Sequence, residues 1–340
     1  MEILKTGKIA PGVLEGILGK ISIDDSRVAV GPGIGEDAAA IDFGDRYLIV
    51  KSDPITFTTD RIGWYVVNIN ANDVAAMGGE PRWFLVTMLL PQEKTTPSLI
   101  REIMKDVSDS CRALGISLVG GHTEVTHGLE YPILSGTMLG EAEKNELVQT
   151  DGVRPGDILY MTKGVAIEAT SIIARERAGE VKAQFGEEFF KRCMEFLENP
   201  GISVMKDART ARRAVRVRGM HDPTEGGLLT GAYEMARGAG IGLQIDTDGV
   251  PVYEETGLLC RHFGLSPYYS TASGSLLIAV RKEDARRLEK AFGEGAGPHS
   301  PLARIGEFTG RNEPVRVTEK GMVQEISPTG RDELTKLIGM

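Results

Sequence analysis

Short apolar runs alternate with stretches of helical periodicity along this 340-residue chain, and that alternation restricts the fold more than any other feature. The runs have the length of buried strands. In the first half they are Tyr47–Val50, Phe84–Leu90, Ser117–Val119 and Ile133–Leu139. The clearest helix covers 97–114, where Thr96 can cap the start, Pro97 suits the first turn and Gly115 suits the exit. The pattern predicts a mixed α/β (α+β) fold.

A polar, turn-rich stretch at Asp151–Asp157 predicts a domain boundary. We therefore expect two domains, 1–152 and 153–340, each long enough to bury its own core. The second domain is predicted to open with a strand at Ile158–Thr162. Its further predicted elements are helices at 165–178, 187–198, 203–215, 224–237 and 282–292, a strand at Leu276–Val280 and a surface loop at 293–300.

The charge balance limits the classes of partner. Lys and Arg number 39 against 48 Asp and Glu, a net charge of −9. We expect neither nucleic acid nor a membrane as a partner, because both need clustered cations, although a net charge does not exclude a local basic patch. The three cysteines lie far apart, which argues against a disulfide framework. With no apolar leader at its start, the protein is expected to be cytoplasmic.

A glycine-rich segment, Val30–Ala39, is the first that could carry chemistry. Bare glycine turns followed by an acid allow a backbone to approach a polyanion. The spacing GxGxG is not a dinucleotide-binding fingerprint, and no phosphate-binding GxxxxGK[ST] loop occurs in the chain. A hairpin turn capped by Asp37 explains the same letters about as well.

The next segment is a predicted helix that starts after Asp60 and ends at Gly78 or Gly79. Asp73 falls on its apolar stripe. A buried carboxylate needs a hydrogen bond, a cation or a metal, because burying it alone costs several kcal/mol. We favour metal or ligand contact, since Asn68 and Asn72 add carboxamide oxygens nearby. Pairing with an Arg or a backbone amide is the alternative.

Two further segments pair glycines with polar side chains. Gly120 and Gly121 are predicted to end a strand before His122–Glu124, a common ligand position, although an ordinary turn is equally simple and the zinc motif HExxH is absent. In His221–Leu229, Thr224 is predicted to cap a helix whose N-terminus could bind phosphate or carboxylate. An ordinary Asp-Pro turn is the alternative. Ser270–Ser275 could line a pocket or form a turn.

Taken in order, these segments resemble the AIR synthase (PurM-like) ATP-binding superfamily. The matching strings are GIGEDAA (33–39), Asp53 after a strand, NDVAAMG (72–78), GGHTE (120–124) and HDPTEGG (221–227). The resemblance covers nearly the whole chain. The second half looks most like hydrogenase-maturation HypE proteins, and two strings are also close to thiamine-monophosphate kinase.

The resemblance implies a two-domain architecture in which the N-terminal domain forms a β-barrel across a homodimer and the C-terminal domain is α+β. It also implies ATP and Mg²⁺. The implied metal ligands are Asp37, Asp53, Asp73 and Glu124. The implied nucleotide-binding residues are Gly35, Asp37, Asp53, Asn72, Gly120, Gly121, Thr123, Asp222, Thr224, Gly226 and Gly227. Mg²⁺ prefers such hard oxygen ligands and bridges phosphates.

The family resemblance implies an enzyme that uses ATP to activate a small substrate by phosphoryl transfer; it identifies no catalytic base. HypE proteins end in a carrier cysteine, whereas this chain ends in Met340. Two alternatives stay open: a non-catalytic nucleotide-binding partner in a hydrogenase-type maturation complex, which the missing cysteine motivates, and a thiamine-monophosphate kinase-like enzyme.

Overall fold

The computed structural model describes residues 9, 11–56, 60–295, 302–327 and 331–338. The chain forms two compact units. The N-terminal unit comprises residues 23–31 and 37–147; the C-terminal unit comprises 148–340 together with 1–22 and 32–36. This division lies five residues before the predicted one. It also gives the glycine-rich residues 32–36 to the second unit, because they contact residues far along the chain.

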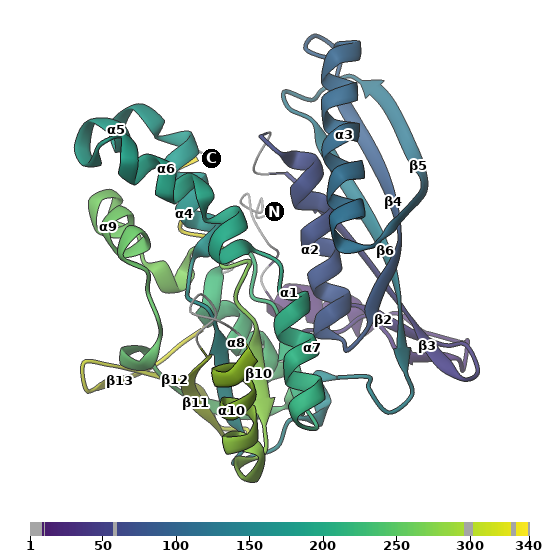
Figure 1. Cartoon of the computed structure of the whole chain (residues 1–340). Helices are drawn as coiled ribbons and strands as arrows, with labels where there is room; N and C mark the ends of the chain where they lie inside the picture. The colour runs from purple at the N-terminus through teal and green to yellow at the C-terminus, as the bar shows by residue number, and fades with distance from the viewer. Residues whose placement is uncertain (1–8, 10, 57–59, 296–301, 328–330, 339–340) are drawn as a thin grey trace. The chain divides into compact units, whose positions relative to one another are not determined.

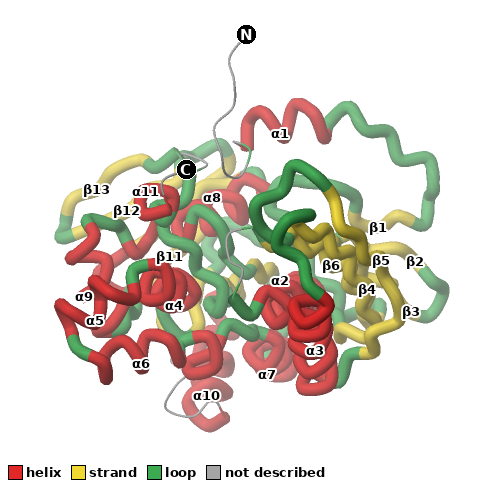
Figure 2. Tube along the Cα trace, turned by 90° about the horizontal axis from the view of Figure 1, so that it is seen from above, coloured by secondary structure: helices red, strands yellow, loops and turns green. Residues whose placement is uncertain are grey.

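The N-terminal unit is a six-stranded sheet with two helices on one face (Figure 2). The strand order is β1 (Val28–Val30), β2 (Ala39–Asp42), β3 (Arg46–Ile55), β6 (Ile133–Glu143), β4 (Glu80–Pro91) and β5 (Ser117–Thr126). All neighbours are antiparallel except β4 and β5, which are parallel. This parallel pair is joined by α3 (Pro97–Leu114), as a parallel connection requires.

The two helices of this unit differ in burial. α3 begins at the predicted residue, with Thr96 Oγ1 accepting the Leu99 N–H at 3.2 Å, and ends at Gly115 with φ 72°. Its buried side chains occupy one stripe. α2 (Ile62–Ala76) lies between α3 and the sheet and is buried almost all round. A polar side chain on α2 therefore meets protein whichever way it points.

The C-terminal unit contains a seven-stranded sheet with helices packed against it (Figure 1). Its order is β13 (Met322–Glu325), β12 (Val315–Glu319), β9 (Ile241–Asp246), β11 (Leu302–Arg311), β7 (Ile158–Thr162), β10 (Leu277–Val280) and β8 (Gly219–His221). The α-helices are α1 (Pro11–Leu18), α4 (Ile167–Glu176), α5 (Ala178–Phe185), α6 (Glu187–Glu195), α7 (Met205–Ala214), α8 (Gly227–Ala239), α9 (Glu254–Phe263), α10 (Ala285–Gly295) and α11 (Thr335–Ile338).

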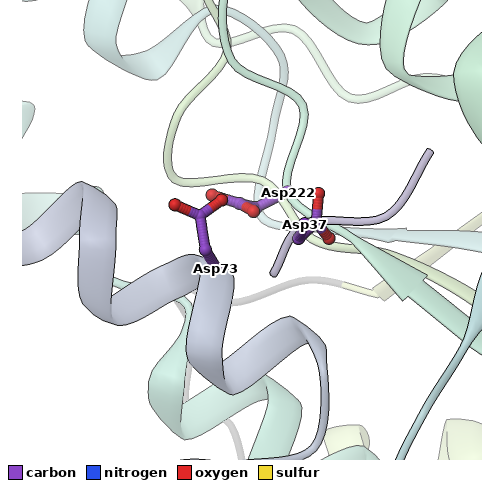
Figure 3. Close-up of side chains that lie close together, drawn as sticks. All are labelled: Asp37, Asp73 and Asp222. Atoms are coloured by element: carbon purple, nitrogen blue, oxygen red, sulfur yellow. The ribbon is translucent and has the colours of Figure 1, made fainter. Parts of the chain in front are cut away.

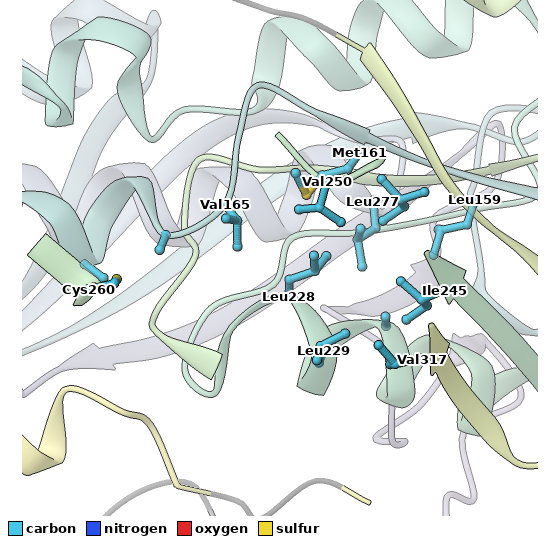
Figure 4. Close-up of a cluster of buried hydrophobic side chains, with 14 of the residues drawn as sticks. Leu159, Met161, Val165, Leu228, Leu229, Ile245, Val250, Cys260, Leu277 and Val317 are labelled. Atoms are coloured by element: carbon cyan, nitrogen blue, oxygen red, sulfur yellow. The ribbon is translucent and has the colours of Figure 1, made fainter. Parts of the chain in front are cut away.

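One hydrophobic core holds this unit together (Figure 4). Leu159 and Met161 of β7, Leu277 of β10 and Leu228 of α8 are fully buried in it. β7 and β10, both interior strands of the sheet, are buried on both faces, which accounts for their continuous apolar sequence.

The structure corrects two details of the predicted elements. Several elements have no counterpart in the prediction: helices α1, α5, α9 and α11 and strands β1, β8, β9, β11, β12 and β13. Residues 293–295 belong to α10 rather than to a loop, and 296–300 lie outside the described residues. Over the described chain, no helix has the length and apolarity to cross a bilayer.

Candidate functional site

Two buried carboxylates meet in the N-terminal unit. Asp73 projects from α2, and Asp37 stands in the segment that leads into β2 (Figure 3). Both side chains are buried, and their carboxylate oxygens lie within 4.8 Å of each other. The sequence suggests that Asp73 needs a cation or hydrogen bonds; the structure adds a second acid beside it.

Lys51 is a basic neighbour of Asp73. Its Nζ lies 3.4 Å from Asp73 Oδ1 and 3.5 Å from Asp53 Oδ2, so one ammonium group serves two carboxylates. Lys51 and Asp53 are two residues apart on β3 and therefore point to the same face of the sheet. The sequence analysis missed Lys51. The signal that could have found it is this i, i+2 spacing to Asp53.

Asn70 fixes β3 against α2. Its Oδ1 accepts the Asp53 N–H at 2.9 Å, and its Nδ2 donates to the carbonyls of Asp53 at 3.2 Å and Val66 at 2.8 Å. A side chain at Gly136 would collide with this carboxamide, since a Cβ there would lie 2.5 Å from Nδ2. Asn70 thus positions Asp53 on the strand, whereas Asn68 bonds the carbonyl of Trp64 within its own helix.

The donor set suits a divalent cation with oxygen ligands. Two carboxylates this close repel each other when both are ionised, and burial strengthens the repulsion. A dication that bridges them removes that cost and accepts the same hard oxygens. Asp53 and Glu124 do not belong to the cluster that Asp37 and Asp73 form. Lys51 contacts both Asp53 and Asp73 and so links Asp53 to this pair of acids.

The glycine segment before Asp37 packs within the C-terminal unit. The Gly35 carbonyl accepts Thr150 Oγ1 at 2.5 Å, and Glu36 Oε1 accepts the Thr150 N–H at 3.2 Å. Gly35 has φ 83°, and a Cβ there would lie 2.6 Å from the Glu234 carbonyl. Close backbone packing therefore explains this glycine. The segment connects β1 to β2, which pair antiparallel. It is therefore also the hairpin connection that the sequence analysis gave as the alternative.

The predicted turn at Gly120–Gly121 is wrong. β5 continues through both glycines and through His122–Glu124 to Thr126. Gly121 has φ 146°, and a Cβ there would collide with the Val86 carbonyl of the neighbouring strand. Close packing against β4 thus requires glycine at this position, and the register shift of the β4–β5 ladder lies just before it, between Leu118 and Gly120. The side chains of His122 and Glu124 are exposed and contact each other, with Nε2 and Oε2 3.2 Å apart.

The predicted helix start at Thr224 is also wrong. α8 begins at Gly227, after Gly226, and both glycines have positive φ. A Cβ on Gly227 would lie 2.7 Å from the carbonyls of Tyr268 and Ser270. The Thr224 carbonyl, rather than its side chain, accepts the Gly227 N–H at 3.0 Å. Asp222, directly after β8, is buried in the C-terminal unit.

The anion expected at the start of α8 is supplied by the chain itself. Asp332 Oδ2 accepts the Gly226 N–H at 2.8 Å and the Thr271 hydroxyl at 2.7 Å. Burial raises the pKa of Asp332. Burial also raises the pKa of Glu168 to about 7; a hydrogen bond from Ser273 lowers it and the charge of Asp332 raises it. The sequence analysis gave Ser270–Ser275 as a pocket lining or a turn and found neither acid.

Two family models match the chain: the N-terminal domain of AIR synthase related proteins over residues 35–142, and the C-terminal domain of the same proteins over residues 154–318. The chain belongs to the AIR synthase related family. The match covers both units and includes Asp37, Asp73 and Asp222.

Named relatives in this family have different activities. A putative hydrogenase expression/formation protein of Methanocaldococcus jannaschii is 25% identical over 83% of this chain and 82% of its own length. A selenide, water dikinase of Geobacter metallireducens is 32% identical over 72% of this chain and 69% of its own. The crystal structure of E. coli HypE superposes with a TM-score of 0.70, at 23% identity, over 90% of this chain and 93% of that one. The fold is thus the two-domain fold of HypE.

Proposed function

We propose that this member of the AIR synthase related family is an ATP- and Mg²⁺-dependent enzyme that activates a small substrate by phosphoryl transfer. The observation that carries the proposal is the buried pair Asp37 and Asp73, which suits a divalent cation. Relatives support the nucleotide: HypE has been crystallised in complex with ATP, and a thiamine-monophosphate kinase with AMPPCP and TMP.

In this proposal Asp37 and Asp73 hold Mg²⁺. Bound Mg²⁺ would neutralise phosphate charge and orient the phosphates. Lys51 lies next to Asp73 and would turn toward the phosphates once the cation compensates the acid. Asn70 keeps Asp53 and its strand in register with α2. With charge neutralisation and positioning as the main demands, no covalent intermediate on the protein is needed.

The cysteines support a diffusible acceptor rather than a carrier thiol of this chain. Cys111, Cys193 and Cys260 are all buried. Burial raises their thiol pKa values to about 11, 12 and 12. Thiols that stay protonated and covered are poor nucleophiles. The phosphoryl acceptor is therefore proposed to be a small molecule that enters from solvent.

Calorimetric titration with a nonhydrolysable ATP analogue, with and without Mg²⁺, tests the nucleotide site. We expect binding that depends on Mg²⁺ and is lost in Asp73→Asn, whereas Asp45→Asn, an exposed control in the β2–β3 turn, binds normally. No binding at millimolar analogue would refute the proposal.

A second assay separates the candidate reactions. ADP formation is measured with small amides, with selenide and with thiamine monophosphate as acceptors. Stimulation by one acceptor identifies the substrate class, and product analysis for thiamine diphosphate tests the kinase alternative. Tight Mg-ATP binding without ADP formation, in the presence or absence of a candidate partner protein, would instead support the non-catalytic alternative.

A further inference from the structure

Positive charge is concentrated in two short stretches of this acidic chain. Residues 205–218 and 281–290 contain eleven Lys and Arg against four Asp and Glu, a net charge of +7, so the rest of the chain carries −16. The first stretch includes α7 and the second includes the start of α10. The two helices pack against each other in the C-terminal unit and lie side by side in Figures 1 and 2.

Most of the basic side chains in these two stretches are exposed to solvent, whereas two of the four acidic side chains are buried. Eight of the basic side chains are exposed and form what we call the basic face: Lys206, Arg213, Arg216, Arg281, Lys282, Arg286, Arg287 and Lys290. The acid Asp207 is buried and pairs with the buried Lys163 at 3.1 Å. Asp284 is buried as well. Glu289 is exposed but accepts the Tyr160 hydroxyl at 2.6 Å. The exposed side chains of the two stretches are therefore eight cations and two acids, Glu283 and Glu289, a net charge of +6.

Asp284 holds two guanidinium groups of the basic face. Arg281 Nε lies 2.9 Å from its Oδ2, and Arg287 contacts its Oδ1. These contacts lower the pKa of Asp284 despite its burial, so the acid stays ionised as their anchor. An anchored guanidinium loses less side-chain entropy when it binds a carboxylate, and its planar fork favours bidentate contact.

The basic face has none of the apolar side chains that form the centre of most protein interfaces. Among the described residues, the large exposed hydrophobic side chains all lie outside 205–218 and 281–290. A partner of this face must therefore be recognised by charge and hydrogen bonds rather than by an apolar anchor.

We propose that the basic face is a docking surface for the acidic face of a partner protein. An acidic protein is favoured over nucleic acid on three observations. Each helix has 10 or 11 residues and is only about 15 Å long, so a nucleic-acid duplex would extend beyond it. The rest of the chain carries a net charge of −16, which would repel the phosphates of that duplex. The face has no exposed aromatic side chain on which bases could stack. The anchored arginines also suit discrete carboxylates. Docking by charge would give fast, salt-sensitive association.

The test uses a fluorescent peptide of twenty glutamates as the probe, with a 20-base-pair RNA duplex as the competing class. Anisotropy is measured at low salt for the full-length protein and for the triple variant Arg213→Glu, Arg216→Glu, Arg286→Glu. We expect the variant to bind the peptide about tenfold or more weakly, since each exposed pair contributes modestly and three are reversed. Carbodiimide coupling should join the peptide to Lys206, Lys282 and Lys290 in preference to other lysines.

The matched control reverses three exposed cations of α3: Arg101→Glu, Lys105→Glu and Arg112→Glu. It changes the net charge equally and should alter peptide binding less than twofold. An equal loss in the control would overturn the proposal, and so would an RNA duplex that binds wild type more tightly than the peptide and is lost with the basic face. Glutamine at the same three arginines replaces the reversal if that protein does not fold. Mg-ATP affinity, measured in parallel, should stay at the wild-type value, which separates this docking surface from the proposed nucleotide site.

Discussion

The change Asp73→Asn removes one charge from the proposed metal site and keeps the side chain's shape. Without ligand, it abolishes an attraction to Lys51 at 3.4 Å and a repulsion from Asp37 within 4.8 Å. At an effective dielectric constant near 20 the attraction is about 5 kcal/mol and the repulsion about 3.5 kcal/mol. The amide is also cheaper to bury than the carboxylate. The opposing effects should leave the unfolding free energy within about 2 kcal/mol of wild type.

Ligand binding has no such compensation. Loss of one anionic ligand should weaken Mg-ATP binding about 100-fold, which is about 2.7 kcal/mol. At a ligand concentration 100 times the wild-type Kd, Mg-ATP stabilises wild type by about 2.7 kcal/mol and the variant by only about 0.4 kcal/mol. For a unit of this size the difference corresponds to about 5–9 °C in Tm.

Thermal unfolding with and without Mg-ATP measures both quantities on the same sample. Asp45→Asn is the control; it removes the same charge at the far end of β3, about 26 Å along the strand from Asp53. An unchanged Mg-ATP shift in Asp73→Asn, with an unchanged Tm in buffer, would refute the metal-ligand role. If Asp73→Asn fails to fold, the prediction that attraction and repulsion nearly cancel is wrong. Asp37→Asn would then test the metal-ligand role independently.

Three further predictions concern stability and assembly. The folded-state pKa of Glu168 is raised from 4.5 to about 7, so stability should fall as pH rises from about 4.5 to 7. Urea unfolding at pH 5 and pH 8 measures this decline in the unfolding free energy. Glu168→Gln should reduce the decline by about 3 kcal/mol, and an equal decline in both proteins would contradict the prediction. Thr96→Ala should cost about 1 kcal/mol by removing the cap of α3, with Ser98→Ala as the exposed control; equal midpoints in urea would count against the cap. A homodimer is expected to form along the exposed edge strand β5, so Val125→Lys should shift sedimentation from dimer to monomer, and a wild-type monomer at micromolar concentration would rule this out.

Local sequence signals predicted the elements whose stability is also local. α3 has its cap, its proline and its terminal glycine within the helix and the residues beside it, and its boundaries match the prediction. The strands around Tyr47, Phe84 and Ile133 were predicted but prove longer, since pairing with neighbours extends a strand beyond its apolar centre. Mixed α/β architecture in two units follows from the same signals.

Signals that depend on distant neighbours could not be interpreted from the sequence. Gly121 looks like a turn residue, yet it is a strand residue that must pass close to the Val86 carbonyl. Gly227 looks like a weak point inside a helix, yet it starts the helix because Tyr268 and Ser270 leave no room for a side chain. Asp332 and Gly226 are 106 residues apart, and only the folded chain reveals their hydrogen bond.

Burial alone does not separate a functional acid from a structural one, and the groups beside each acid add to the comparison. Asp207 has Lys163 at 3.1 Å, and that ammonium also donates to the backbone carbonyls of Gly201 at 3.2 Å and Ser203 at 2.6 Å. Asp284 contacts two arginines. Such acids are compensated within the protein. Asp73 instead has a second buried carboxylate, Asp37, within 4.8 Å, and its neighbour Lys51 also contacts the partly exposed Asp53 at 3.5 Å. Two buried carboxylates this close repel each other when both are ionised, and a bridging dication would relieve that repulsion, which favours a bound dication as part of the working protein.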